Sequence, residues 1–362
     1  MMIEVDGSMG EGGGAVLRTA LALGAVSQRP VHIYNIRAKR AKQGLQPQHL
    51  RGVEALAKLT NAKIEGAKLN STELTFEPAI IEGGRHRIDI GTAGSTTLVL
   101  QILMPAAAFA CKPVEVEITG GTDNPAAIPI DFMKNVTLST LRKMGYQGDV
   151  ECVQRGHYPQ GGGIVRARIE PIEKLQALML TEPGKVVNIS GLAHCVRLPA
   201  DISTRMAHAA NKALIKAGYS KVQIKSESYP PAQDPHLGPG AGITLWAETE
   251  GGAILGSSSL GKLGKPAEQV GQEAAENLIA QLKTGCAVDR YLTDQLVPYL
   301  ALAEGVSEIT SAEITSHTLT NIALVEQILD VKFELQDGRG QAGNIKVNGI
   351  GFAKGKFKRL AS

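Results

Sequence analysis

One pattern recurs in this chain: a strand-like segment, a glycine-rich loop and then an apolar helix. It occurs first as DGSMGEGGGAVLRTAL and again, about 85 residues later, as IGTAGSTTLVLQIL. A recurrence of this kind indicates a fold made of similar α/β units. Because each unit must pack its helices against a face of its sheet, the sequence predicts a layered α/β architecture.

Strand-like and helix-like segments alternate along the 362 residues, with one interruption of domain size. The linker-like stretch LTEPGK and the later turn TGC bracket that segment. We therefore predict an α/β (α+β) protein. Residues 1–184 and 286–362 would form a large domain of repeated units, and residues 185–285 would form an inserted small α/β domain.

Composition narrows the class of protein. With 43% hydrophobic and 20% charged residues, the chain can bury a sizeable core and does not read as disordered. A net charge of +3 permits nucleic-acid binding but does not indicate it. The four cysteines lie far apart, as reduced thiols of an intracellular protein do. No signal peptide or apolar run of membrane-spanning length is visible, so we expect a cytoplasmic protein.

The first glycine-rich loop is a candidate phosphate site. Five glycines lie among the eight positions from Gly7 to Gly14, and a helix follows directly. Glycines let backbone N–H groups approach a ligand, and a helix N-terminus favours an anion. A tight structural turn is the alternative, but five glycines exceed what a turn requires. Glu11 and Arg18 flank the loop.

Two motifs come close to known nucleotide sites and fail. The loop fits a dinucleotide fingerprint, but the second strand leads into Arg37, Lys39 and Arg40 where an acidic residue should hold a ribose hydroxyl. These cations suit phosphates instead. The stretch GSSSLGK at 256–262 resembles a P-loop, but Leu263 stands where the motif needs Ser or Thr. We interpret that stretch as a surface loop.

Cations and one histidine suggest phosphate chemistry. Arg37 and Arg40 follow a strand at a spacing that would let both point into one cleft, and arginine matches phosphate geometry. The eight histidines form no HxH or HExxH metal pattern. His317 precedes the apolar run TNIALVEQIL, at a predicted strand-to-helix turn. A helix N-terminus lowers the pKa of an imidazole, which favours a neutral nucleophile for phosphorus. From spacing alone, a structural role stays open.

Seven motifs in the same order resemble the RNA 3′-terminal phosphate cyclases. They are DGSMGEGGGAVLRTAL, IRAKRAKQGLQPQHL, GTAGSTTLVLQ, GGTDNPAAIPIDF, GHYPQGGG, DRYLTDQL and SHTLTNIALVE. They extend from residue 6 to about residue 327, nearly the whole chain. One departure is Gln43, where the family commonly has proline.

The resemblance implies a fold and a reaction. The large domain would consist of repeated βαβαββ-type units similar to those of carboxyvinyl transferases, with a smaller α/β domain inserted late. The reaction would use ATP and a divalent metal ion, Mg²⁺ or Mn²⁺, to convert an RNA 3′-terminal phosphate into a 2′,3′-cyclic phosphodiester. Its intermediates would be a histidyl–AMP and an RNA(3′)pp(5′)A end. RNA 3′-phosphate ends would be the partner, with no membrane, and a homo-oligomer is left open.

The resemblance also implies roles for particular residues. His317 would be the nucleophile, and Glu11 would be a ligand for the metal ion. Arg18, Arg37, Arg40 and Gln48 would hold phosphates of the nucleotide and the RNA. The nucleotide would be bound by Gln101, Tyr291, Leu292, Thr293, Asp294 and Gln295, with Pro129 lining the adenine pocket. For the basic tail (Lys354, Lys356, Lys358 and Arg359), a solvated segment is favoured over an RNA contact.

Three other functions are weighed against this one. A non-catalytic, cyclase-like protein of ribosome assembly would lack the histidine, whereas His317 is present with Glu11 and Arg18. A carboxyvinyl transferase would not need a histidine nucleophile at this turn. An NAD-binding oxidoreductase would need the missing acidic residue.

Overall fold

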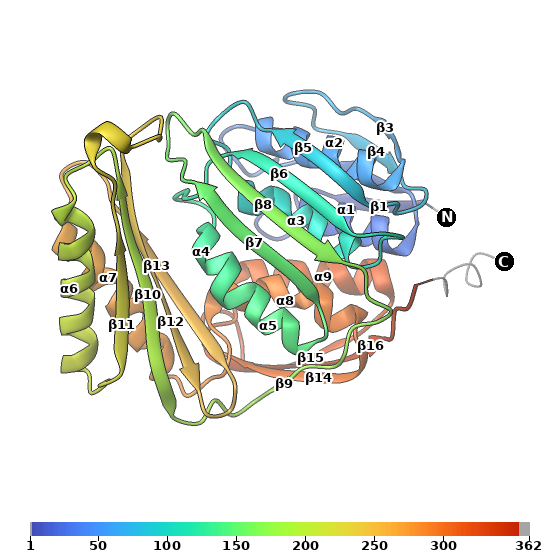
Figure 1. Cartoon of the computed structure of the whole chain (residues 1–362). Helices are drawn as coiled ribbons and strands as arrows, with labels where there is room; N and C mark the ends of the chain where they lie inside the picture. Colours follow the sequence, from blue (N-terminus) through green and yellow to red (C-terminus); the bar gives the residue numbers. More distant parts are fainter. Residues whose placement is uncertain (1, 355–362) are drawn as a thin grey trace.

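The computed structural model describes residues 2–354, and three of its sheets belong to similar units (Figure 1). The first unit contains β1 (Ile3–Asp6), α1 (Gly14–Ser27), β2 (Val31–Tyr34), α2 (Pro47–Thr60), β3 (Lys63–Glu65) and β4 (Leu74–Glu77). The second contains β5 (Gly84–Asp89), α3 (Thr96–Ala107), β6 (Val114–Gly120), α4 (Ile130–Phe132), the π-helical turn η1 (Met133–Thr137), α5 (Leu138–Lys143), β7 (Gln147–Gln154) and β8 (Gly163–Glu170). The third contains β9 (Met179–Leu180), α8 (Arg290–Leu302), β14 (Glu304–Ser311), α9 (Ser316–Leu329), β15 (Phe333–Gln336) and β16 (Gly343–Ile350).

All three units share one strand order. The sheets run β1-β2-β4-β3, β5-β6-β8-β7 and β9-β14-β16-β15. In each sheet the first two strands are parallel, and the remaining neighbours are antiparallel. Each unit therefore reads βαβαββ, and the predicted α/β fold of repeated units is confirmed. The third copy escaped detection in the sequence because its first strand has two residues and lies far from its helix.

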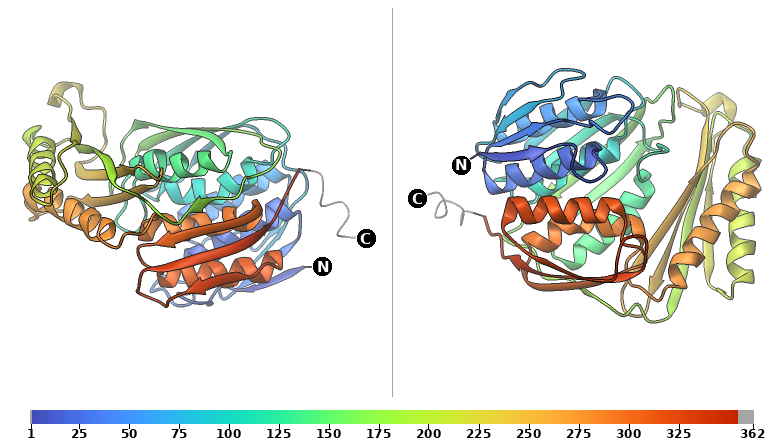
Figure 2. Two further views of the ribbon diagram at one scale, coloured as in Figure 1. Left: turned by 90° about the horizontal axis from the view of Figure 1, so that it is seen from below. Right: turned by 180° about the vertical axis from the view of Figure 1, so that it is seen from behind.

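The helices of the three units pack together between the sheets (Figure 2). Helix α1 contacts α2, α3 and α9, while α8 contacts α3 and α9. Twelve of the 14 residues of α1 and ten of the 12 residues of α3 are buried. A helix that is apolar on all sides is stable only where neighbours cover every side. The alanine- and leucine-rich sequences of α1 and α3 thus place these two helices at the centre.

The chain leaves the third unit after β9 and returns at α8. Between them it forms β10 (Val186–Val196), α6 (Asp201–Lys216), β11 (Val222–Glu227), the 3-10 turn η2 (Pro231–Gln233), β12 (Gly240–Thr249), β13 (Ile254–Leu260) and α7 (Ala267–Leu282). These strands make a separate sheet, in the order β11-β10-β12-β13, and α6 packs against α7 beside it. We call residues 186–282 the inserted segment. It projects from one side of the three units (Figure 2), and its status as a domain with the predicted boundaries stays a prediction.

One sequence interpretation is wrong. The stretch at 256–262 is not a surface loop, because its first five residues belong to β13, where Gly256 and Ser257 are buried. Of the basic tail, Lys354 donates from Nζ to the carbonyl oxygen of Ala110, and the other three cations lie outside the described residues. Among residues 2–354, no helix is both long and apolar enough to cross a bilayer.

Candidate functional site

A cavity of about 550 Å³ lies where the N-terminal halves of several helices meet the inserted segment. Seven predicted site residues line it: Arg18, Gln101, Pro129, Tyr291, Asp294, Gln295 and His317. They come from α1, α3, α8, α9 and the segment before α4. Residues separated by up to 299 positions in the sequence, Arg18 and His317, thus share one cavity.

His317 is the second residue of α9, so the predicted strand-to-helix turn is confirmed. The hydroxyl oxygen of Thr315 accepts a hydrogen bond from the Thr318 N–H and caps the helix. The His317 side chain is 44% exposed, and its Nε2 lies 3.0 Å from Oε2 of Glu11. Burial lowers the pKa of His317, Glu11 opposes that change, and the charges of Arg18 and Arg40 add to it. The ring is therefore mainly neutral at neutral pH.

Glu11 connects the glycine-rich loop to a cation, Arg40, and to the His317 imidazole. Its Oε2 is 3.2 Å from a guanidinium nitrogen of Arg40 and also faces His317. The glycines next to it make room for these side chains. A Cβ on Gly13 would lie 2.6 Å from Nη2 of Arg40, and one on Gly14 would lie 2.5 Å from Nε2 of His49. The glycines are thus required by the close approach of cationic and imidazole side chains to the loop backbone.

Arg18 and Asp294 both line the cavity and are partly buried. Arg18 donates from Nε to Oε1 of Gln101 over 3.1 Å. Burial lowers the pKa of Arg18 to about 10, and the nearby charge of Asp294 opposes the change. Burial also raises the pKa of Asp294 to about 7, against the influence of Arg18. At neutral pH Asp294 is only partly ionised, so it neutralises Arg18 incompletely. An anionic ligand in the cavity could therefore pair with Arg18, whose guanidinium is positioned by Gln101.

Six predicted residues do not line the cavity, and two of them, Glu11 and Arg40, lie beside it through the contact of Glu11 with His317. Arg37 donates to the carbonyl oxygen of Gly44 over 3.3 Å, and the charge of Arg40 helps to lower its pKa after burial. Gln48 accepts a hydrogen bond from the Ser95 N–H at 2.8 Å, which ties α2 to the start of α3. Leu292 and Thr293 are fully buried. Arg37, Gln48, Leu292 and Thr293 therefore have no surface in the cavity, and any role in ligand binding would be exerted from outside it.

Sequence analysis missed several lining residues. Lys265, Ser258 and Ser259 come from the inserted segment and face the cavity, as do Arg290 and Phe132. A signal for the first three was present, because they lie in and just after the P-loop-like stretch. His49 was also missed, although it belongs to the cation-rich motif. Burial, followed by the charges of Arg18 and Arg37, lowers its pKa to about 3.

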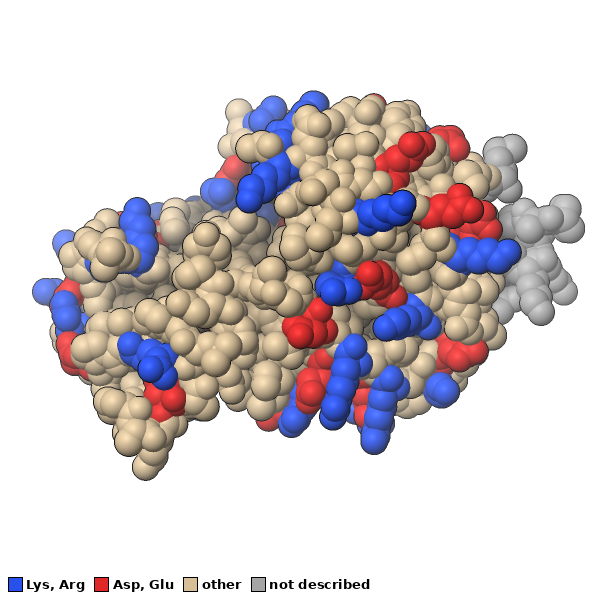
Figure 3. Space-filling view, turned by 90° about the horizontal axis from the view of Figure 1, so that it is seen from above, with Lys and Arg blue, Asp and Glu red and all other residues tan. Residues whose placement is uncertain are grey.

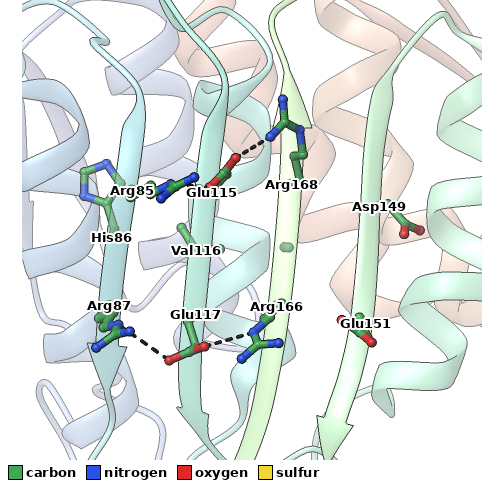
Figure 4. A pocket seen from close by; sticks show the side chains of 11 residues that line it. Arg85, His86, Arg87, Glu115, Val116, Glu117, Asp149, Glu151, Arg166 and Arg168 are labelled. Carbon is green, nitrogen blue, oxygen red and sulfur yellow. Dashed lines mark hydrogen bonds and ion pairs between the residues drawn. The ribbon is translucent and has the colours of Figure 1, made fainter.

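A second hollow, of about 560 Å³, lies on the outer face of the β5-β6-β8-β7 sheet. Figure 4 shows its arginines and glutamates alternating across the strands. Glu117 pairs with Arg87 at 3.6 Å and with Arg166 at 2.9 Å, and Glu115 pairs with Arg85 and Arg168. On the side of the molecule drawn in Figure 3, blue and red side chains are likewise interleaved. Mutually paired charges on an open sheet leave few groups for a ligand, so the first cavity is the better candidate.

Comparison with known proteins identifies the family of the chain. A profile of the RNA 3′-terminal phosphate cyclase family matches residues 9–335. An RNA 3′-terminal phosphate cyclase of Caldivirga maquilingensis is 51% identical over 92% of this chain and 94% of its own length. One from Pyrococcus furiosus is 48% identical over 96% of this chain and 98% of its own, and one from Methanopyrus kandleri is 46% identical with the same coverage. The chain therefore belongs to the RNA 3′-terminal phosphate cyclase family, which is a family of enzymes.

Proposed function

We propose that this enzyme uses ATP to convert an RNA 3′-terminal phosphate into a 2′,3′-cyclic phosphodiester, with His317 as the nucleophile. The observation that carries the proposal is that His317 and Arg18 line one cavity, with the Glu11 carboxylate 3.0 Å from the His317 ring. A mainly neutral imidazole, a carboxylate and a partly buried guanidinium are groups that suit nucleotidyl transfer to a histidine. The alternative, a non-catalytic RNA-binding protein of the same family, would have no use for this set.

The nucleotide would enter the cavity with its base among apolar groups. Pro129, Phe132 and Tyr291 line one part of it, and a volume of about 550 Å³ is ample for a nucleotide. Arg18, Arg290 and Lys265 contribute cationic groups on the other lining elements. Arg40 and Arg37 lie beside the glycine-rich loop, where they would meet phosphates that extend beyond the cavity.

The first chemical step would occur at His317. A ring nitrogen of the neutral imidazole would form a bond to the α-phosphorus of ATP. The bond from that phosphorus to the bridging oxygen would break, and pyrophosphate would leave. Arg18 would stabilise negative charge as it develops, since a partly buried guanidinium interacts more strongly with it than one in open water. The contact of Nε2 with Glu11 fixes the plane of the ring before the nucleotide binds.

Glu11 fits the role of a ligand for Mg²⁺ or Mn²⁺. These ions prefer oxygen ligands, and Mg²⁺ is usually held by one or two carboxylates together with substrate phosphates. The Glu11 carboxylate is partly exposed and lies within reach of His317. A bound ion would neutralise phosphate charge there, and the chain's own groups would orient the nucleotide.

Two transfers to RNA would complete the reaction. An oxygen of the RNA 3′-phosphate would attack the phosphorus of the histidine-bound AMP, breaking the nitrogen–phosphorus bond and restoring His317. The neighbouring 2′-hydroxyl would then attack the RNA phosphorus, expelling AMP and losing its proton. Only the first of these steps uses a side chain as the leaving group, so His317 is required once per turnover.

The proposal can be tested by covalent labelling. The enzyme would be incubated with ATP labelled at the α-phosphate and Mg²⁺ or Mn²⁺, then denatured. We expect acid-labile, base-stable label on the wild type and none on His317→Ala. His208→Ala is the matched control, because His208 is an exposed histidine on α6. Label retained by His317→Ala, or a wild type that binds ATP without becoming labelled, would contradict the proposal.

A further inference from the structure

A second histidine–carboxylate cluster lies behind the cavity wall. Asp123 follows β6, His157 lies in the loop between β7 and β8, and His194 is on β10 of the inserted segment. Their exposed fractions are 2%, 6% and 1%. One donor atom from each side chain lies within 4.8 Å of the other two, with 3.8 Å between Nε2 of His194 and Oδ1 of Asp123. The cluster joins the second unit to the inserted segment.

Several polar atoms of this cluster have no hydrogen-bond partner within the described chain. They are Oδ1 of Asp123, Nε2 of His157 and both ring nitrogens of His194. Buried polar groups in folded proteins are almost always paired, so unpartnered atoms that face one another call for an explanation. A ligand bound between the three side chains would account for one unpartnered atom of each: the Asp123 oxygen and one ring nitrogen of each histidine.

The surroundings favour a cation as that ligand. The guanidinium of Arg155 lies 3.4 Å from Asp123, 2.8 Å from Asp131 and 2.7 Å from Glu227, so three carboxylates share it. Burial lowers the pKa values of His157 and His194, which keeps both imidazoles neutral. The ionised cluster would therefore carry surplus negative charge and offer two neutral nitrogen donors.

The backbone of β12 is shaped to accept these rings. A Cβ on Gly240 would lie 1.9 Å from Cγ of His157, and one on Gly242 would lie 3.0 Å from Cε1 of His194. The His157 ring could not keep its place if residue 240 carried a side chain, and the His194 ring would have to shift slightly for one at residue 242. The two rings face each other with centroids 5.2 Å apart, above these two glycines.

We propose that Asp123, His157 and His194 bind one divalent transition-metal ion, of the class represented by Zn²⁺, which fastens the inserted segment to the second unit. Two imidazole nitrogens and one carboxylate oxygen are ligands that zinc accepts. Zinc–nitrogen bonds of about 2.0–2.1 Å would draw the three donor atoms closer together than they are here. Because Asn124 directly follows Asp123 and lines the nucleotide cavity, the ion would also steady that wall. This site is separate from the ion expected at Glu11.

Metal binding to the full-length enzyme tests the site directly. The protein would be freed of metal with a chelator, dialysed and titrated with Co²⁺ alone, followed by displacement with Zn²⁺. We expect about one tightly bound equivalent per chain, visible absorption bands from Co²⁺ with nitrogen ligands, and a higher thermal midpoint with Zn²⁺. His194→Gln should lose the bands and the midpoint shift, whereas His208→Gln on exposed α6 should keep both.

The remaining outcomes also decide the question. If His194→Gln does not fold, His157→Gln replaces it, and the wild-type titration stands without either variant. A wild type that binds no Co²⁺, or whose bands persist in the ligand variants, would overturn the proposal. The unpartnered atoms would then be satisfied by water. None of these readouts depends on ATP or RNA, so failure here leaves the proposed function untouched.

Discussion

The candidate cavity and the buried cluster each bring a histidine close to a carboxylate, yet the two places differ in access to solvent. At the cavity, the side chains of His317 and Glu11 are 44% and 33% exposed. At the cluster, His194 and Asp123 are 1% and 0% exposed, next to a buried Arg155. The outer face of the second sheet adds a third case, in which arginines and glutamates pair in open water (Figure 4).

The difference shows what each arrangement can do. Charges in the cavity are still partly hydrated, so a substrate can exchange for a neighbour without a large desolvation cost. Charges in the cluster have already lost their water, and each one depends on the others for compensation. On the open sheet, water hydrates and screens the charges, so the ion pairs contribute little to the free energy of unfolding. Four predictions exploit these contrasts, from the largest expected effect to the smallest.

Removing the buried cation should have the largest effect. Arg155→Met would leave Asp123, Asp131 and Glu227 without their shared partner, and breaking such a pair costs about 3–5 kcal/mol. Arg168→Met, on the open sheet face, should destabilise the protein far less, because its pairs with glutamates are exposed to water. Urea unfolding of both variants measures the two free energies. Equal losses would abolish the contrast between buried and open charges.

Crowding the cluster should have the next largest effect. Gly240→Ala would place a methyl group 1.9 Å from Cγ of the buried His157 ring, and overpacking of this kind costs about 1–3 kcal/mol. Gly338→Ala is the control, since no atom of residues 2–354 lies within 4 Å of the position that its Cβ would take. Thermal and urea unfolding would compare the two. A Gly240→Ala protein as stable as the control would mean that His157 can move aside freely.

A pH-dependent stability difference should follow from Asp294. Burial raises its folded pKa from 3.8 to about 7, although Arg18 opposes the rise, so the folded state holds this proton more tightly than the unfolded state. Its stabilisation is complete below pH 3.8 and is lost as the pH rises to about 7. Asp294→Asn does not titrate, so its stability relative to wild type should increase across that interval and then level off.

Urea unfolding of Asp294→Asn and wild type at several pH values would measure this difference. Asp337→Asn, on an exposed turn, provides the control. A difference between Asp294→Asn and wild type that does not change with pH would mean that the carboxyl keeps its usual pKa, as an open cavity wall would allow.

The smallest effects concern the titration of His317. Burial lowers its pKa, Glu11 raises it, and Arg40 lowers it. Glu11→Gln should therefore move the imidazole pKa further down, and Arg40→Gln should move it up. A titration of the His317 ring protons by NMR would follow both. Shifts of the same sign in the two variants would rule out this electrostatic account.

Much of the fold could be predicted from the sequence, because two of the three units each contain a recognisable glycine-rich loop between a strand and an apolar helix. The third unit could not be recognised. Its first strand, β9, has two residues, and the inserted segment separates it from α8. Strand β13 was also mistaken for a loop, since its serines and glycines lack a strand-like apolar pattern. This segment is a strand because it pairs with β12 and packs against α7, and neither contact can be read from the sequence.

The candidate site was predictable as a set of segments but not as a set of side chains. Tyr291, Asp294 and Gln295 line the cavity, whereas Leu292 and Thr293 between them are buried in the core. Helix α8 explains this pattern, because residues three and four apart share a face and the intervening ones turn away. Asp123, His157 and His194 could not be grouped at all, since only the fold brings them together.

The position of the inserted segment has a consequence for folding. Met179 of β9 pairs with Glu308 of β14, so the third sheet closes across 129 residues. The first two units contain all their strands before residue 171, and they can form while the remainder is still being synthesised. The apolar side of α1 and α3 that packs against α9 and α8 in the folded protein would then remain exposed to water until those two helices have been synthesised and have packed. If the inserted segment folds first, it shortens the loop that must close, and its folding speed would set how long that apolar surface stays exposed.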